Sequence, residues 1–406
     1  MANQYISKVV LGTETLIDLT DSTVTPATLM LGTVAYGADG SRLVGTATGG
    51  DEGSAYQDED GYIVLGEGES SAPQGTLSIT ANGTYDVAQY AGASVEVPAG
   101  MTKTELKKFL QRDSTFKDID WPDGMTAIGA YAFTGLINFK PSSLPEGITS
   151  IGNYAFSGCT ALALTKLPEG ITSIGEFAFN SCYELSLTSL PSGIKRIPAS
   201  AFAYCTSLAL TELPAGVTYI DVKAFVSCHS LALTELPAGV TYIGGNAFQF
   251  CNGLTHISCE GPITTLGSNA FTGNASYPMQ LVTASFPNMA LTSSLGGAFG
   301  STSAANACQQ LAFCDIGSTT GIGSNAFANC YALETLVLRK TASVCTLANV
   351  SAFLNTPMRG YNGKTGKVYV PSALISSYQT ATNWATLYNA GTVEFLAIEG
   401  SEYERD

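Results

Sequence analysis

Between residues 120 and 360 the hydrophobic positions recur with a period longer than that of any single helix or strand. The dipeptide Ala-Phe returns every 23 residues from Phe133 to Phe271, and the steps then lengthen to 28, 28 and 26 residues, ending at Phe353. A clear unit, residues 144–166, reads LPEGITSIGNYAFSGCTALALTK. One such unit cannot bury its own apolar side, whereas stacked units cover one another. The pattern predicts a solenoid of about ten coils of 23–28 residues.

Within one unit the pattern predicts short extended pieces joined by turns. Leu162 and Leu164 alternate with small polar residues, as in a short half-buried strand. Ile171 and Ile174 bracket a second extended piece, and Phe179 follows as the bulkiest apolar residue, with a cysteine one helical turn later. We therefore expect a mainly β fold with short helical or irregular turns.

Two columns of the repeat are expected to form the core. They are Phe156, Phe179, Phe202, Phe225 and Phe248, and Cys159, Cys182, Cys205, Cys228 and Cys251. A ladder of disulfides or metal ligands is one interpretation of the cysteines, because stacked coils bring their backbones within disulfide range. Side chains of one column point the same way, however, and other units place Leu136, Asn274 and Thr302 at this position. We expect buried free thiols.

The unit Ile-x-x-Ile-Gly-x-x-Ala-Phe-x-x-Cys-x-x-Leu resembles the BspA-type leucine-rich repeat, over about residues 120–395. Residues 367–387 resemble the terminal cap of such arrays. The resemblance implies a leucine-rich-repeat solenoid and a role in surface adhesion or protein interaction.

The first hundred residues predict small β-rich modules. Asp39-Gly40 and Asn82-Gly83 each stand between extended segments, which is a hairpin signal. The stretch 51–74 is acidic and rich in Gly and Ser, so we expect a linker, although Tyr62–Leu65 has the composition of a strand.

Two of these segments are similar to modules near the N-termini of phage tail-fibre and minor structural proteins. The first has Leu31-Gly32-Thr33-Val34-Ala35, followed by Gly40, Leu43 and Gly45-Thr46, and the second is TLSITANGTYDVAQYAGASVEVP. The resemblance implies a virion protein. The expected domains are a virion-attachment module (1–50), the linker (51–74), a small β module (75–100), the solenoid (101–365) and a cap with an acidic tail (366–406).

Charge separates the two parts of the chain. Charged residues make up 13% of the sequence and the net charge is -15. Residues 1–100 hold 13 of the 33 acidic residues but only 2 of the 18 basic ones. This balance argues against binding nucleic acid or anionic lipid. No basic, apolar leader and no apolar run of 18 residues occurs, so we expect a virion protein made in the host cytoplasm and released by lysis, without membrane insertion.

The variable columns of the repeat supply candidate contact residues, because a solenoid places each column on one face. Aromatic and polar side chains gather there from the third unit onward, and rigid aromatics suit protein or sugar contacts. A solvated face with incidental aromatics is the alternative interpretation. The candidate receptor contacts are Tyr183, Arg196, Tyr204, Tyr219, His229, Tyr242 and Phe250.

Signals for chemistry are weak. Residues 321–326 match a dinucleotide-binding glycine pattern, but they are the repeat segment once more. Asp58 and Asp60 match part of a calcium-binding loop, but the Glu that completes such a loop is not at the required spacing. His229 and His256 have no ligand partner at metal-site spacing. No catalytic constellation stands out, so we expect no enzyme activity, no cofactor and no metal.

The sequence thus predicts a phage structural protein, a tail fibre, baseplate or head fibre. Residues 1–100 would contact other virion proteins, and the solenoid would attach to a bacterial surface glycan or protein. A homo-oligomer is expected, with a trimer favoured by analogy. A bacterial cell-associated adhesin of the BspA type is the alternative function, and a glycan-degrading spike is disfavoured by the lack of a carboxylate pair.

Overall fold

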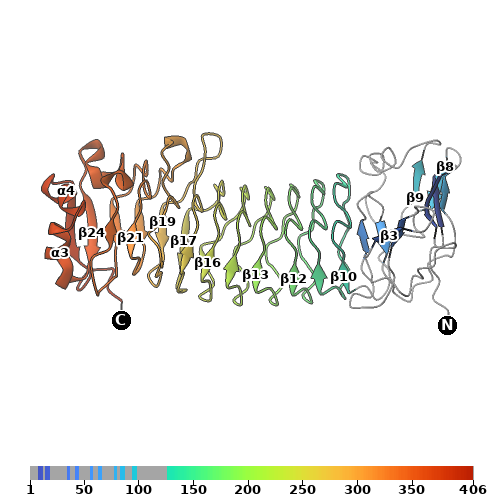
Figure 1. The fold of residues 1–406 in the computed structure, drawn as a ribbon, viewed down its shortest axis with the longest axis horizontal. Coiled ribbons are helices and arrows are strands. Elements are labelled where there is room, and N and C mark those ends of the chain that lie inside the picture. Colours follow the sequence, from blue (N-terminus) through green and yellow to red (C-terminus); the bar gives the residue numbers. More distant parts are fainter. Residues whose placement is uncertain are drawn as a thin grey trace. The chain divides into compact units, whose positions relative to one another are not determined.

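A computed structural model describes residues 126–405 and, ahead of them, the backbone of nine short strands. The chain divides into two units, Met1–Leu185 and Ser186–Asp406. Each unit is described by itself below. Both contain coils of the same layout, and Figure 1 shows the coils of the second unit following one another from β13 to β25.

The strands before residue 100 form small sheets. They are β1 (Lys8–Leu11), β2 (Glu14–Asp18), β3 (Val34–Tyr36), β4 (Arg42–Val44), β5 (Ala55–Gln57), β6 (Ile63–Leu65), β7 (Leu77–Ile79), β8 (Gly83–Asp86) and β9 (Ser94–Val97). The antiparallel pairs are β1–β2, β3–β4, β5–β6 and β8–β9, and β7 lies parallel to β1.

These pairings decide three of the sequence predictions. The hairpin around Asp39-Gly40 is confirmed, because β3 and β4 are partners. The hairpin at Asn82-Gly83 is wrong: β7 pairs with β1, and β8 takes β9 as its partner instead. Within 51–74, the predicted linker, β5 and β6 pair with each other, so Tyr62–Leu65 contributes a strand. The side chains of Asp58 and Asp60 lie outside the described residues.

Each described coil of the first unit contributes a two-residue strand. These are β10 (Ala127–Ile128), β11 (Ser150–Ile151) and β12 (Ser173–Ile174), paired in parallel and in register. The sheet order is β12-β11-β10-β5-β6. The second extended piece predicted for each unit is therefore confirmed, whereas Leu162 and Leu164 are buried without forming a strand.

The second unit carries two parallel sheets and one short pair. The sheet that we call the short-strand sheet has the order β13-β14-β16-β18, and the long-strand sheet has the order β15-β17-β19-β20-β22-β24-β25. The short-strand sheet contains β13 (Arg196–Ile197), β14 (Tyr219–Ile220), β16 (Tyr242–Ile243) and β18 (Thr265–Leu266). The long-strand sheet contains β15 (Glu235–Leu236), β17 (His256–Cys259), β19 (Thr283–Ser285), β20 (Phe313–Asp315), β22 (Thr335–Val337), β24 (Gly366–Val370) and β25 (Val393–Ala397). The pair is β21 (Gly321–Ile322) and β23 (Thr346–Leu347).

A stack of phenylalanine rings fills the core of each unit. In the first unit the rings of Phe133, Phe156 and Phe179 lie 5.3 Å apart from coil to coil. In the second unit the stack starts at Phe202 and ends at Phe353, with centroid distances of 5.3 to 5.7 Å. Neighbouring parallel strands lie about 4.8 Å apart, so one ring per coil comes to rest on the next. The solenoid predicted from the period is confirmed.

In most coils the turn after the repeat phenylalanine contains a left-handed residue, so it is not the helical turn that the spacing suggests. Ser181 lies between Phe179 and Cys182 with a φ of 60°, in the left-handed region that breaks a helix. The Ile-Gly pair of the repeat also has a steric cause. A Cβ on Gly175 would lie 2.4 Å from the backbone nitrogen of Asn153 in the previous coil, so only glycine permits this approach.

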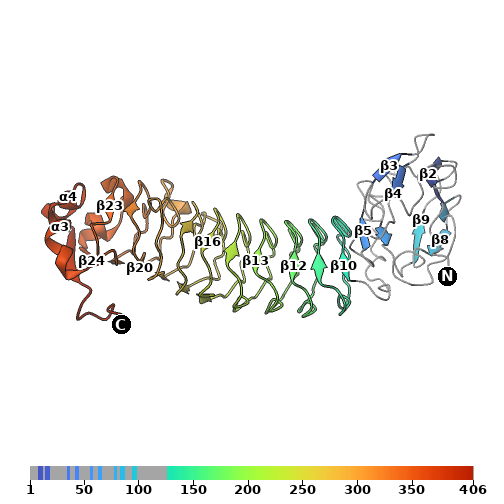
Figure 2. The same ribbon diagram turned by 60° about the horizontal axis from the view of Figure 1, so that its bottom comes forward.

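The second unit ends in a different arrangement. Helices α3 (Ile375–Thr380) and α4 (Trp384–Asn389) stand between β24 and β25. Short 3-10 helices occur at Ala304–Asn306, Val350–Phe353, Pro357–Arg359, Tyr361–Gly363 and Ser372–Leu374. The Trp384 indole donates to the Cys345 carbonyl at 2.8 Å, and the Tyr378 hydroxyl accepts from the Cys345 backbone N–H at 2.8 Å. In Figure 2 the chain leaves the α3 end of this unit and turns back toward β24 and β20.

Candidate binding surface

One column of side chains faces solvent along the short-strand sheet. The register aligns Arg196, Tyr219, Tyr242 and Thr265 across the four strands. The next residue of each strand, such as Ile220, is buried. Because successive residues of a strand point to opposite faces, the column is directed outward.

Three members of this column stack on one another. The rings of Tyr219 and Tyr242 have centroids 5.2 Å apart and an interplanar angle of 18°. The guanidinium carbon of Arg196 lies 5.7 Å from the Tyr219 centroid, within cation–π range. Arg196 also forms an ion pair with Asp221, whose side chain is only 11% exposed. Tyr219 is 43% exposed and Tyr242 is half-buried, so the column is held in place yet open to a partner.

Tyr204 and Phe250 lie in the turn that follows the repeat phenylalanine, outside the short-strand sheet. Their φ angles are 62° and 63°, and the same position holds Gly135 and Gly158 in the first unit and Asn329 later in the chain. Left-handed backbone is unfavourable for bulky residues. The turn therefore gives no structural reason for an aromatic residue at Tyr204 or Phe250. Tyr204 is 47% exposed and Phe250 is half-buried.

His229 is less accessible than the other candidates. Its ring stacks against Tyr277 at a centroid distance of 4.2 Å, and Tyr277 comes from the enlarged coil after Phe271. The Nε2 atom of His229 and the Oδ1 atom of Asn252, one coil later, are buried and have no hydrogen-bond partner among the described residues. Desolvation lowers the pKa of His229, which favours the neutral imidazole.

The structure brings together only part of the predicted contact set. Arg196, Tyr219 and Tyr242 form one stack, whereas Tyr204 and Phe250 lie at the turn. Tyr183 belongs to the first unit, where it is 47% exposed.

A second aromatic stack, in the first unit, is absent from the sequence predictions. The rings of Tyr131, Tyr154 and Phe177 follow one another at 4.9 and 4.6 Å and are almost parallel. All three residues have left-handed backbone, with φ of 62°, 57° and 56°. An aromatic two positions before the repeat phenylalanine in three successive units is the sequence signal for this stack.

The cysteines of the repeat connect successive coils. The thiols of Cys159, Cys182, Cys228 and Cys251 donate to the carbonyl of the phenylalanine 26 residues earlier, at 2.9 to 3.1 Å. All ten cysteines are buried thiols outside any disulfide, Cys205 among them. Burial raises the pKa of the Cys159, Cys251 and Cys330 thiols far above their usual range. The thiols are thus uncharged donors inside the core.

Cys308 takes the same place although the sequence puts it off the column. Its thiol donates to the Phe271 carbonyl, and its backbone N–H donates to the Phe299 carbonyl at 2.9 Å. The residues between Phe299 and Cys308 loop outward through the 3-10 helix at Ala304–Asn306. An inserted loop therefore changes the spacing between the phenylalanine and the cysteine in the sequence, while the cysteine keeps its position in the core.

The described residues contain no cluster of three or more His, Cys, Asp or Glu side chains that could hold a metal ion. In the same part of the chain, the helices are too short to cross a membrane. The outward column presents the Tyr219 and Tyr242 rings and the Arg196 guanidinium, which is paired with Asp221.

The family model described as the BspA type leucine rich repeat region matches the chain in six copies, over residues 102–232 and 224–359. These stretches cover more than half of the sequence. The chain belongs to the BspA-type leucine-rich repeat family. No curated protein matches the chain.

Solved structures similar to this BspA-type protein include three bacterial proteins. A leucine rich cell surface protein from Faecalibacterium prausnitzii A2-165 is 20% identical, with a TM-score of 0.36, over 83% of this chain and 95% of that chain. A leucine-rich repeat protein from Bacteroides ovatus ATCC 8483 is 18% identical, with a TM-score of 0.35, over 86% and 99%. The leucine rich repeat protein of T. pallidum is 23% identical, with a TM-score of 0.27, over 53% and 76%.

Proposed function

We propose that this BspA-type protein is a non-enzymatic adhesion protein that binds a surface glycan or protein through its short-strand sheet. The observation that carries the proposal is the solvent-facing stack of Arg196, Tyr219 and Tyr242. Its rings are ordered before any partner arrives, so less side-chain entropy is lost on binding. Family membership supports the same function, since the family is one of adhesion and interaction proteins.

The chemistry of the stack favours a partner that presents C–H and hydroxyl groups. Because Arg196 and Tyr242 cover the two faces of the Tyr219 ring, the column offers ring edges and phenol hydroxyls to solvent, and these suit the C–H and hydroxyl groups of a sugar ring or of protein side chains. The Arg196 guanidinium, which is 61% exposed and paired with Asp221, lies at one end of the column and suits a hydroxyl, carboxylate or phosphate. Surface polysaccharides combine these two features.

The experiment compares whole-cell binding of fluorescent wild-type protein with that of a Tyr219→Ala/Tyr242→Ala variant by flow cytometry. We expect about tenfold weaker binding or more, because truncating an aromatic hot-spot residue costs about 2 kcal/mol or more. Tyr388→Ala removes a tyrosine of similar exposure from α4 and should bind as the wild type does. Normal binding by the double variant would exclude the stack as the contact surface.

A finer form of this proposal is that the adhesion protein belongs to a phage virion. Its support is the resemblance of two segments within residues 1–100 to modules of tail-fibre and minor structural proteins, whereas the family match covers later residues. In this form the protein is made in the host cytoplasm and residues 1–100 contact other virion proteins. Mass spectrometry of purified virions tests this form, and absence of the protein from them excludes it.

We also propose self-association, because repeated weak contacts gain strongly from multivalency. A homotrimer is favoured by analogy with fibre proteins. Light scattering on the full chain measures the mass directly, and a monomer at all accessible concentrations would exclude oligomerisation.

A further inference from the structure

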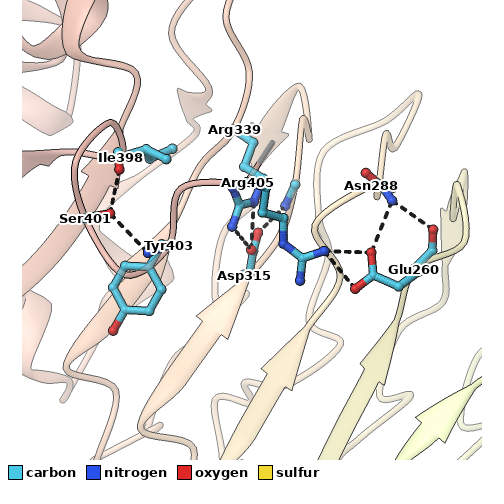
Figure 3. Close-up of polar contacts among 9 residues, drawn as sticks. Glu260, Asn288, Asp315, Arg339, Ile398, Ser401, Tyr403 and Arg405 are labelled. Atoms are coloured by element: carbon cyan, nitrogen blue, oxygen red, sulfur yellow. Dashed lines mark hydrogen bonds and ion pairs between the residues drawn. The ribbon is translucent and has the colours of Figure 1, made fainter.

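The segment that follows β25 lies across the outer face of the long-strand sheet. Its start is fixed, because the Ile398 N–H donates to Val370 and both the N–H and the hydroxyl of Ser401 donate to the Ile398 carbonyl. From there the chain crosses the strands, and Figure 3 shows Tyr403 and Arg405 reaching back over the sheet. We call residues 400–405 the crossing segment.

Tyr403 occupies an aromatic slot formed by two strands. Its ring stacks on Phe313 of β20 at a centroid distance of 5.2 Å. It meets Tyr369 of β24 edge-on, at 4.6 Å and 72°. Desolvation is the main reason that the pKa of Tyr403 is raised to about 12. The slot therefore accepts an aromatic side chain through ring contacts.

Glu260 binds Arg405, the arginine two residues after Tyr403. The Nη1 atom of Arg405 lies 2.7 Å from both carboxylate oxygens of Glu260, 145 residues away in the sequence. The Asn288 amide donates to the Glu260 carbonyl at 2.9 Å and to its carboxylate at 3.4 Å, which orients the acceptor (Figure 3). The contact for the basic group is thus made by Glu260, which Asn288 holds in place.

A buried ion pair lies beneath the crossing segment. Asp315 of β20 is 1% exposed and bonds to Arg339 at 2.8 Å. Burial raises the pKa of Asp315, and the Arg339 bonds oppose this shift, with a weaker contribution from Arg405. Arg339 neutralises Asp315, so Glu260 is the carboxylate that meets the arginine of the crossing segment.

The crossing segment turns before it crosses the sheet. The Glu404 N–H donates to the Ser401 carbonyl at 3.2 Å, so the chain is not extended from Ile398 to Arg405. The segment contacts the sheet through Tyr403 and Arg405. Its far end is held weakly, because the Arg405–Glu260 pair is 46% and 44% exposed, and exposed ion pairs contribute little. A partner peptide could therefore displace it.

We propose that the outer face of the long-strand sheet is a binding site for a short partner peptide of the form aromatic-x-arginine, which Tyr403-Glu404-Arg405 occupies in the free protein. The aromatic ring enters the Phe313–Tyr369 slot and the guanidinium binds Glu260. This surface is separate from the short-strand sheet, so it adds a second, protein-directed specificity to the molecule.

The experiment measures fluorescence anisotropy of a labelled GSEYERD peptide, the sequence of residues 400–406, with full-length protein. A Tyr403→Ala/Arg405→Ala variant vacates the site and should bind the peptide about tenfold more tightly than wild type. Adding Glu260→Gln to that variant should reverse the gain. Glu334→Gln, which removes an exposed carboxylate paired with Lys364, is the matched control. Added to the same double variant, it should leave the tighter peptide binding unchanged.

Two results would overturn the proposal. One is an opened variant that binds the peptide no better than wild type, since the segment would then not compete. The other is peptide binding that Glu260→Gln does not weaken or that a GSEAEAD peptide reproduces. Circular dichroism spectra that match the wild type show that each variant is folded, so either result is decisive.

Discussion

The thiol of Cys251 donates a hydrogen bond to the carbonyl of Phe225, 26 residues earlier. This span is one 23-residue coil plus the three residues between phenylalanine and cysteine, so the bond ties a coil to the one before it. The carbonyl also accepts from the Cys228 backbone N–H at 3.1 Å, so the thiol is its second donor and uses its other lone pair. A small apolar side chain with one weak donor suits this position, which explains the repeated cysteine.

Native thiols should therefore be unreactive. All ten cysteines are buried, and burial raises the pKa of the Cys251 thiol, so little thiolate forms at pH 8. We expect a chromogenic disulfide reagent to modify none of them in the native protein and all ten after unfolding in guanidinium chloride. Fewer than ten thiols in the unfolded, unreduced protein would reveal disulfides and refute the hydrogen-bond assignment.

Loss of one core ring should destabilise the second unit. Phe225 is fully buried and stacks between Phe202 and Phe248. Phe225→Ala should cost about 3–5 kcal/mol, the usual loss for a buried phenylalanine. Urea unfolding followed by circular dichroism measures the change. Tyr219→Ala, which removes an exposed ring, should cost no more than about 1 kcal/mol, and equal losses would contradict the assignment of the core.

Lys223 offers a stabilising substitution. Its φ of 57° is left-handed, and the same position holds Asn246 and Asn269 in the following coils. Asparagine tolerates this backbone better than lysine. Lys223→Asn should raise the unfolding free energy by up to ~1 kcal/mol, measured as the urea midpoint. Lys195→Asn, outside the left-handed positions, should change it by less than about 0.5 kcal/mol.

Acid should weaken the second unit through His229. Its pKa is lowered from 6.5 in the folded state, so the unfolded chain binds more protons between the two pKa values. Stability is therefore complete above about pH 6.5 and falls as the pH drops toward the folded pKa. His229→Asn should reduce the difference in melting temperature between pH 8 and pH 5.

Tyr277→Ala provides the test of cause for this pH dependence. It uncovers the imidazole without removing it, so the desolvation that lowers the pKa should shrink. A pH dependence that both variants leave unchanged would assign it to other groups.

The sequence predicted those features that the period repeats. Phe156 and Phe225 are buried because each coil must cover its neighbour, and Tyr219 faces outward because it precedes a buried isoleucine in a strand. The left-handed turn was missed, since a three-residue step from phenylalanine to cysteine also fits a helix. Ser181, with its φ of 60°, decides between the two.

Features that depend on a single unrepeated segment escaped prediction. Tyr277 covers His229 from an enlarged coil, and its place depends on the path of that loop rather than on the period. Arg405 contacts Glu260, 145 residues earlier, because the crossing segment passes over the sheet once. The repeat pattern contains no information about this contact. Cys308 rejoins its column only because the preceding insertion loops outward.

The strict register of the 23-residue coils has a genetic consequence. Strand β14 pairs only with β13 and β16, each one coil away, and Tyr219 aligns with Tyr242. Recombination that deletes or duplicates one whole coil between Phe202 and Phe271 would rejoin every column in register. The outward stack would then lose or gain one side chain, while the core would remain continuously packed. Length, and with it the number of stacked rings presented to a partner, can therefore change in whole steps during evolution without a new fold.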